Sequence, residues 1–228
     1  MFLPLHDQNP IRHVKFAYVT YGLIALNVIV FLVQLTQAGP AFAEFAITFA
    51  AIPSSAWAGE PIDRFPGLPD ELSLITYQFF HADWMHLLGN MAFLWVFGDN
   101  IEDAMGHLKF LLFYLLCGVL AALAYFTFAG DQAGWLIGAS GSVAGVIGAY
   151  ILLYPHARVF VLFRLVIPIP FPVPALWMLG FWIATQIFYV LIGSSEPVAW
   201  WAHIGGVVVG VVLALPFKRR EVPLFGGR

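Results

Sequence analysis

Repeated long apolar stretches constrain this chain more than any other feature. The first runs from Phe16 to Leu35 and gives about 20 mostly apolar residues, the length that an α-helix needs to cross the hydrocarbon core of a bilayer. Over the whole chain 61% of residues are hydrophobic and only 10% are charged, and the mean hydropathy is +0.86. A soluble domain of this size could not cover so much apolar surface, so the sequence predicts an all-α polytopic membrane protein.

Polar or proline-rich segments divide the apolar sequence into six runs. We predict a single membrane domain over residues 1–228, with spanning helices at about 16–35, 84–97, 108–128, 141–154, 175–192 and 201–217. The charged, glycine-containing stretch 98–106 is interpreted as a turn, and the prolines between Pro155 and Pro174 exclude a regular helix there. A cleaved signal peptide is the alternative for the first run, but its length favours a retained helix.

A long loop follows the first predicted helix, from Thr36 to about Gln78. Pro53, Pro61, Pro66 and Pro69 interrupt it and several acidic residues charge it, while its apolar residues are too few to span a membrane. We expect short helices that lie in the membrane interface, around Phe42, Phe45 and Phe49.

Basic residues predict the orientation, because they are retained on the cytoplasmic side. With six spans and both termini cytoplasmic, nine of the ten Lys and Arg residues fall inside, and only Arg64 falls outside. The nine are Arg12, Lys15, Lys109, Arg158, Arg164, Lys218, Arg219, Arg220 and Arg228. We expect a multi-pass integral membrane protein, with a bacterial cell membrane as its location.

Charge and cysteine content argue against several classes of protein. The net charge is −3 and the one basic cluster is Lys218–Arg220, so no nucleic-acid partner is expected. Cys117 is the single cysteine, so neither a disulfide framework nor a thiolate metal site can be built from this chain alone.

The pentapeptide from Gly138 to Ser142 lies where a polar loop meets an apolar helix. Ser140 is flanked by glycines, which permit a tight turn and the close approach of a substrate backbone, so Ser140 is a candidate nucleophile. The alternative is that small residues here only let two membrane helices pack closely.

His203, near the start of the last predicted helix, is the candidate base for Ser140. With the predicted topology both residues lie near the outer end of their helices, and Gly206 and Gly141 lie on faces that would let the two helices approach closely. The alternative is a structural histidine. Helices 141–154 and 201–217 contain no Asp or Glu, which indicates a two-residue Ser-His arrangement.

His86 and Asn90 are four residues apart and therefore share one helix face. Together with the backbone N–H of Ser140 they would donate hydrogen bonds to an oxyanion. A zinc site built from His81, His86 and His203 is the alternative, but Asn90 is a poor zinc ligand. We therefore predict no metal and no other cofactor.

Three motifs in this order resemble those of the rhomboid family of intramembrane serine proteases. They are His86-Leu-Leu-Gly-Asn90, Gly138-Ala-Ser-Gly141 and Ala202-His-Ile-Gly-Gly206. The resemblance implies a six-helix rhomboid-like bundle, a Ser140–His203 dyad, and an oxyanion site of His86, Asn90 and the Ser140 amide, supported by Gly138, Gly141 and Gly206. It further implies a serine-type endopeptidase whose partners are the lipid bilayer and membrane proteins with a transmembrane helix.

The sequence departs from the family's pattern at two places. The Trp-Arg pair that many members carry in the first loop is absent. Ala144 stands where some members have an aromatic residue that stacks on the catalytic histidine.

Two other functions are alternatives to the protease. A non-proteolytic rhomboid-like protein that binds membrane clients would typically lack the Ser or the His, and both are present. A small membrane transporter would usually show repeats and polar residues through the full depth of the membrane, whereas the inner halves of helices 141–154 and 201–217 are apolar. The serine endopeptidase is the function that the sequence favours.

Overall fold

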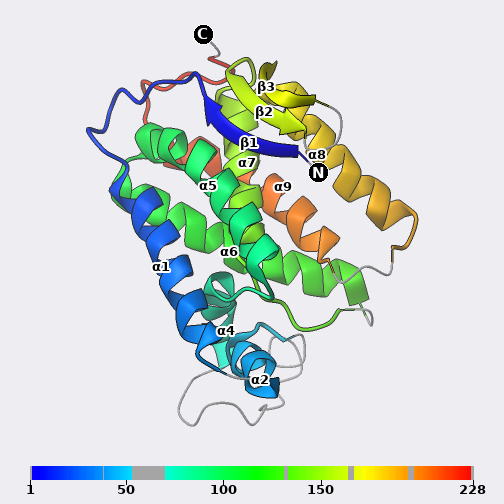
Figure 1. Ribbon diagram of the computed structural model, residues 1–228. Helices are drawn as coiled ribbons and strands as arrows, with labels where there is room; N and C mark the ends of the chain where they lie inside the picture. Colours follow the sequence, from blue (N-terminus) through cyan, green and yellow to red (C-terminus); the bar gives the residue numbers. More distant parts are fainter. Residues whose placement is uncertain are drawn as a thin grey trace.

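A helical bundle with a small sheet at one end makes up the computed structural model of this chain (Figure 1). The structure describes residues 2–37, 39–52, 70–130, 133–163, 167–194 and 198–226. The predicted loop residues 53–69 and the basic residues Arg64, Arg164 and Arg228 lie outside these ranges.

Six helices in this part of the chain correspond to the six predicted runs. They are α1 (Tyr18–Leu35), α5 (Trp84–Met105), α6 (His107–Ala129), α7 (Ser140–Leu153), α8 (Ala175–Leu191) and α9 (Trp200–Phe217). By length and composition α1, α6 and α9 are candidate membrane spans, while α7 and α8 are shorter apolar helices. The predicted helical membrane bundle is confirmed.

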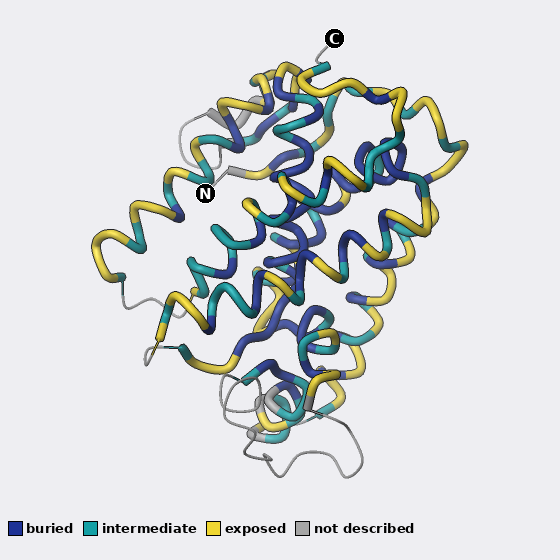
Figure 2. The backbone as a smooth tube through the Cα atoms, turned by 180° about the vertical axis from the view of Figure 1, so that it is seen from behind, coloured by how far each residue is buried: buried dark blue, intermediate teal, exposed yellow. Residues whose placement is uncertain are grey.

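Helix α7 forms the centre of the bundle. Most of its residues are buried, including Val146, Ile147 and Tyr150, whereas α1 and α8 keep long apolar side chains exposed. Figure 2 shows the buried residues concentrated in the middle of the molecule and the exposed ones along the outer helices. An outer surface of exposed apolar residues is what a bilayer would cover.

The first loop contains the short helices that the sequence predicted. Helix α2 (Pro40–Phe49) follows α1, and η1 (Asp70–Leu72), α4 (Ser73–Thr76) and η2 (Tyr77–Phe79) precede α5. Figure 1 shows α2 and α4 at the end of the bundle opposite the sheet. The ring of Phe49 stacks on that of Phe80 with centroids 4.7 Å apart, which fixes α2 against the start of α5.

The predicted turn at 98–106 is wrong, because α5 continues to Met105 and turns only at Gly106, whose φ is +88°. The acidic residues that suggested a turn are buried. Glu102 accepts hydrogen bonds from the backbone N–H groups of Val19 (3.0 Å) and Thr20 (2.7 Å), which are unpaired donors in the first turn of α1. Asp103 accepts from the N–H of His13 at 2.6 Å. Glu102 thus caps α1, and Asp103 binds the backbone that leads into it, so no solvent-exposed turn is needed to explain these carboxylates.

A three-stranded antiparallel sheet in the order β1-β2-β3 was not predicted. It consists of β1 (Phe2–Asp7), β2 (Arg158–Phe163) and β3 (Ile167–Pro174). In β3 every second residue from Pro168 to Pro174 is proline, so all the missing N–H groups fall on one side of the strand. Proline is tolerated in an edge strand whose N–H side faces away from its neighbour.

Candidate functional site

Ser140 is the first residue of α7. Its backbone N–H therefore belongs to the unpaired donors at the helix N-terminus, where the helix dipole favours negative charge. Gly138, two residues earlier, has a φ of +115°, which is accessible to glycine but strained for other residues. Its N–H donates to the carbonyl oxygen of Tyr77 at 2.9 Å, which ties this turn to the first loop.

His86 lies directly over that turn. A methyl group on Gly138 would lie 2.6 Å from both Nε2 and Cε1 of His86, so only glycine leaves room for the imidazole. The backbone N–H of His86 donates to the Asp83 side chain at 2.9 Å, which caps the start of α5. The structure thus brings the predicted residues His86 and Gly138 into contact.

Asn90 lies one turn further along α5 and is 7% exposed. Its side-chain nitrogen Nδ2 is buried and has no hydrogen-bond partner among the described residues. A buried amide donor without a partner costs free energy, typically about 1–3 kcal/mol, unless a ligand or water accepts its hydrogen bond. Asn90 therefore carries a free donor of the kind that a developing oxyanion needs.

Glycines place α7 and α9 in backbone contact, as the sequence predicted. A methyl group on Gly206 would lie 2.4 Å from the carbonyl oxygen of Gly141, and one on Gly210 would lie 2.0 Å from that of Gly145. Gly148 faces the backbone of Val207 in the same way, at 2.3 Å. This close crossing brings the start of α9, with His203, alongside the start of α7, with Ser140.

Gln186 on α8 holds His203, and sequence reasoning missed it. The Nδ1 atom of His203 lies 2.7 Å from Oε1 of Gln186. The rings of Trp182 and Trp200 contact that of His203, the first tilted with centroids 5.6 Å apart and the second edge-on with centroids 6.2 Å apart. An aromatic contact does exist, but it comes from α8 and from the start of α9, whereas the sequence comparison directed attention to position 144 on α7.

Ser140 and His203 are near neighbours through their helices, but no hydrogen bond joins them in the structure, and both are among the described residues. Catalytic hydrogen bonds are often long or absent before substrate binds and form only in the complex. Within the described residues, no group of three or more His, Cys, Asp or Glu side chains could hold a metal ion. The alternative zinc set of His81, His86 and His203 therefore does not form such a group in the structure.

His81 is buried beside His86, with ring centroids 5.1 Å apart. Burial lowers the pKa of His81 to about 3, so this imidazole is neutral at physiological pH. Both of its ring nitrogens lack a partner among the described residues. A neutral His81 places no positive charge beside the predicted oxyanion donors.

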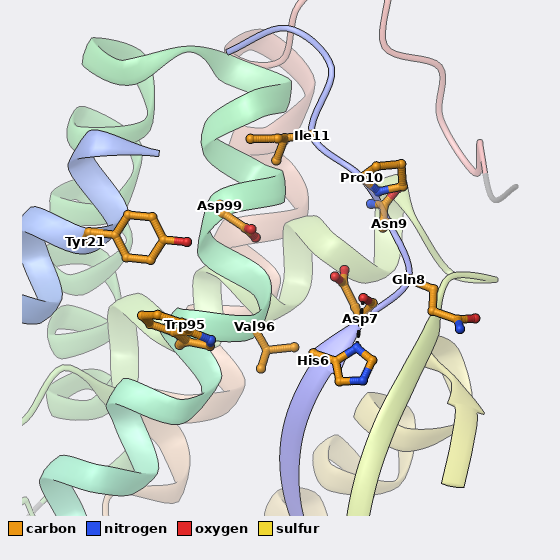
Figure 3. Close-up of a pocket in the computed structure, with 10 residues that line it drawn as sticks. All are labelled: His6, Asp7, Gln8, Asn9, Pro10, Ile11, Tyr21, Trp95, Val96 and Asp99. Atoms are coloured by element: carbon orange, nitrogen blue, oxygen red, sulfur yellow. Dashed lines mark hydrogen bonds between the residues drawn. The ribbon is translucent and has the colours of Figure 1, made fainter. Parts of the chain in front are cut away.

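A cavity of about 450 Å³ lies elsewhere, where β1 meets α1 and the second half of α5. Asp7, Tyr21, Trp95 and Asp99 are among its lining residues, and Figure 3 shows the hydroxyl of Tyr21 directed toward Asp99. It includes none of the predicted site residues.

Comparisons with known proteins agree with these observations. The family model described as Rhomboid domain matches residues 69–220. Rhomboid protein 1, mitochondrial, from Saccharomyces cerevisiae is 30% identical over 151 residues, which cover 62% of this chain and 40% of that protein. Rhomboid protease GluP from Bacillus subtilis is 29% identical over 209 residues, 92% of this chain and 36% of that protein.

Rhomboid protease GlpG from Salmonella paratyphi A is 26% identical over 163 residues, 70% of this chain and 51% of that protein. The matched region thus spans about a third to a half of the length of these relatives. They come from a mitochondrion and from bacteria, so they do not support the expected bacterial membrane over an organellar one.

Proposed function

The chain belongs to the rhomboid family, and on that premise we propose that it is an intramembrane serine endopeptidase with Ser140 as nucleophile and His203 as general base. One observation carries the proposal. His203 is held through Nδ1 by Gln186, which leaves Nε2 as the nitrogen available to a substrate or a hydroxyl, beside the helix that Ser140 begins. A base oriented by a second residue is what activation of a serine requires.

The chemistry follows from these roles. Nε2 of His203 takes the proton from the Ser140 hydroxyl while Oγ attacks the carbonyl carbon of a peptide bond. The resulting tetrahedral intermediate collapses, the bond to nitrogen breaks, and the imidazolium returns its proton to the leaving amine. Water, deprotonated by the same imidazole, then attacks the acyl carbon on Ser140. The ester bond to Oγ breaks, the imidazolium returns its proton to Oγ, and the second product leaves as an acid.

Three donors would stabilise the oxyanion. Among the described residues the Nδ2 group of Asn90 is buried without a partner, the His86 ring lies over Gly138 just before Ser140, and the Ser140 N–H is one of the free donors at the start of α7. Preorganised donors of this kind act in a site from which water is largely excluded, where each is worth more than in solution.

The proposed substrates are membrane proteins with a transmembrane helix, which would reach Ser140 sideways from the bilayer. Helix α8 lies at the edge of the bundle and keeps Trp177, Phe181 and Phe188 more than half exposed, which supports α8 as the side of entry (Figure 1). Orientation with both termini cytoplasmic is part of the proposal and places the site near the outer face.

Cleavage of a transmembrane substrate by the purified protein tests the proposal. Wild type should cleave, and Ser140→Ala should lose essentially all activity. Ser142→Ala is the matched control, because Ser142 lies in the same pentapeptide but its hydroxyl donates to Gln78 at 2.8 Å in the interior. It should keep most activity. Cleavage that persists in Ser140→Ala but is abolished by chelators in wild type would contradict the proposal and indicate a metal-bound nucleophile.

A further inference from the structure

Gln186 occupies an unusual position on α8. The buried side chains of this helix are Ala175, Met178, Leu179 and Gln186, and the first three belong to its first five residues. From Gly180 to Leu191 Gln186 is the only buried residue. Gln186 is thus the one fully buried side chain in this half of α8. Two partly buried aromatic contacts lie beside it, Tyr189 with Trp200 (ring centroids 4.5 Å apart) and Trp182 with His203 (5.6 Å).

The hydrogen bonds of Gln186 fix the orientation of its amide. Its Nε2 lies 3.0 Å from the carbonyl oxygen of Trp182, an atom that can only accept. The NH₂ group must therefore face Trp182, which leaves Oε1 facing His203. Because Oε1 can only accept, Nδ1 of His203 must carry the proton.

The position of this proton determines which ring nitrogen of His203 can act as a base. A neutral imidazole that is protonated on Nδ1 is unprotonated on Nε2, which is the form that can accept a proton from a serine. The opposite tautomer would present an N–H to Ser140 and could not act as its base. Gln186 thus selects the working tautomer and fixes the direction of the ring.

We propose that Gln186 is the positioning residue of His203 and that α8 can be seated in the bundle only in the state in which this base is oriented. The inference rests on the proposed function and deepens it. When α8 moves outward to admit a substrate helix, Oε1 leaves Nδ1 and the base is released from its working tautomer. When α8 returns, the site is closed and the base is restored in a single step, so peptide-bond cleavage waits for closure.

Gln186 is neutral, and this sets the expected response to a charged replacement. The titratable group that faces His203 from the remaining helices is His86 on α5. No carboxylate faces His203 from α7, α8 or α9, since these helices contain no Asp or Glu. A carboxylate at position 186 would therefore add a negative charge beside this imidazole and would favour its protonated form.

The test measures how fast a small fluorophosphonate modifies Ser140, because this reaction needs the oriented base but no substrate helix. Gln186→Met preserves the volume and removes the acceptor, so the rate should fall by about 10²-fold. Ile187→Ala changes the neighbouring, 44% exposed side chain and should react like wild type. Gln186→Glu restores an acceptor and should recover much of the rate, with the acid limb of its pH–rate profile shifted upward by about one pH unit or more.

The outcomes separate the inference from the function on which it rests. If wild type is not modified at Ser140 at all, the proposed function fails. If wild type is modified and Gln186→Met reacts equally fast, the function stands and the inference is overturned. Should Gln186→Met not fold, Gln186→Glu decides: an acid limb identical to that of wild type means that Gln186 only fills space.

Discussion

At the scale of single residues, loss of Asn90 or His86 should lower activity only in part, whereas loss of Ser140 or His203 should abolish it. Asn90→Ala removes the buried Nδ2 donor and His86→Ala removes the ring over Gly138. Each should lower kcat by about 10²- to 10³-fold, the usual effect of one oxyanion donor, with the protein still folded. The combined Ser140→Ala and His203→Ala variant should be no worse than either single change. Full activity of Asn90→Ala would remove Asn90 from the oxyanion site.

Asp7 should make stability depend on pH. Burial, the largest cause, raises the pKa of Asp7 to about 7, against about 3.9 in an unfolded chain. Between these values the folded state holds a proton that the unfolded state has lost, so stability falls as pH rises from about 4 to 7.

Asp7→Asn removes this titration and keeps an acceptor for the Tyr150 hydroxyl. The Tm of the variant minus that of wild type should therefore increase between pH 4.5 and pH 7.5. A difference that stays constant, or decreases, would show that the pKa of Asp7 is not raised in the folded protein.

Sequence reasoning could nominate Ser140, His203, His86 and Asn90 because each is a polar residue beside glycines or on a shared helix face. These assignments stay predictions, although the structure brings their helices together. The role of Gln186 could not be predicted, because it is 17 positions from His203 in the sequence and only the packing of α8 against α9 brings the two together. Its one signal was an amide in an otherwise apolar helix, where polar groups are costly and usually functional.

At the scale of elements, the crossing of α7 and α9 should tolerate no added atoms. Gly210→Ala would place a methyl group 2.0 Å from the backbone oxygen of Gly145, so the two helices must move apart. We expect a loss of about 1–3 kcal/mol in unfolding free energy and a matching loss of cleavage.

Gly180→Ala is the matched control, because no atom lies within 4 Å of a methyl group there. In a helix it should be neutral or slightly stabilising, by up to about 1 kcal/mol. Thermal unfolding of both variants in detergent gives the comparison. Equal stability of Gly210→Ala and wild type would mean that the helices do not depend on this contact.

Helix positions were predictable because apolar runs of about 20 residues leave few alternatives in a bilayer. The end of α5 could not be predicted, because Glu102 and Asp103 look like surface charges until α1 and the residues before it are placed against them. The sheet was missed for a similar reason. Alternating prolines from Pro168 to Pro174 excluded a helix, but β3 becomes an edge strand only when β2 and β1 are beside it.

At the scale of the whole molecule, the distribution of basic residues predicts which end faces the cytoplasm. The sheet and both ends of the chain lie at one end of the bundle (Figure 1). Single cysteines introduced at Asp63 and Glu196, which lie outside the described residues, should react with an impermeant thiol reagent from the outer face. One at Arg219 should not. Equal labelling of all three from one face would contradict the predicted topology.

The central claim is that Ser140 is a nucleophile activated by His203, and a covalent adduct tests it most directly. Wild-type protein treated with a fluorophosphonate should gain one adduct by intact mass, and peptide mapping should place it on Ser140. The adduct should be absent from Ser140→Ala and nearly absent from His203→Ala, while Ser142→Ala should react like wild type. An adduct on another residue, or cleavage of a transmembrane substrate by protein that forms no adduct at Ser140, would contradict the account.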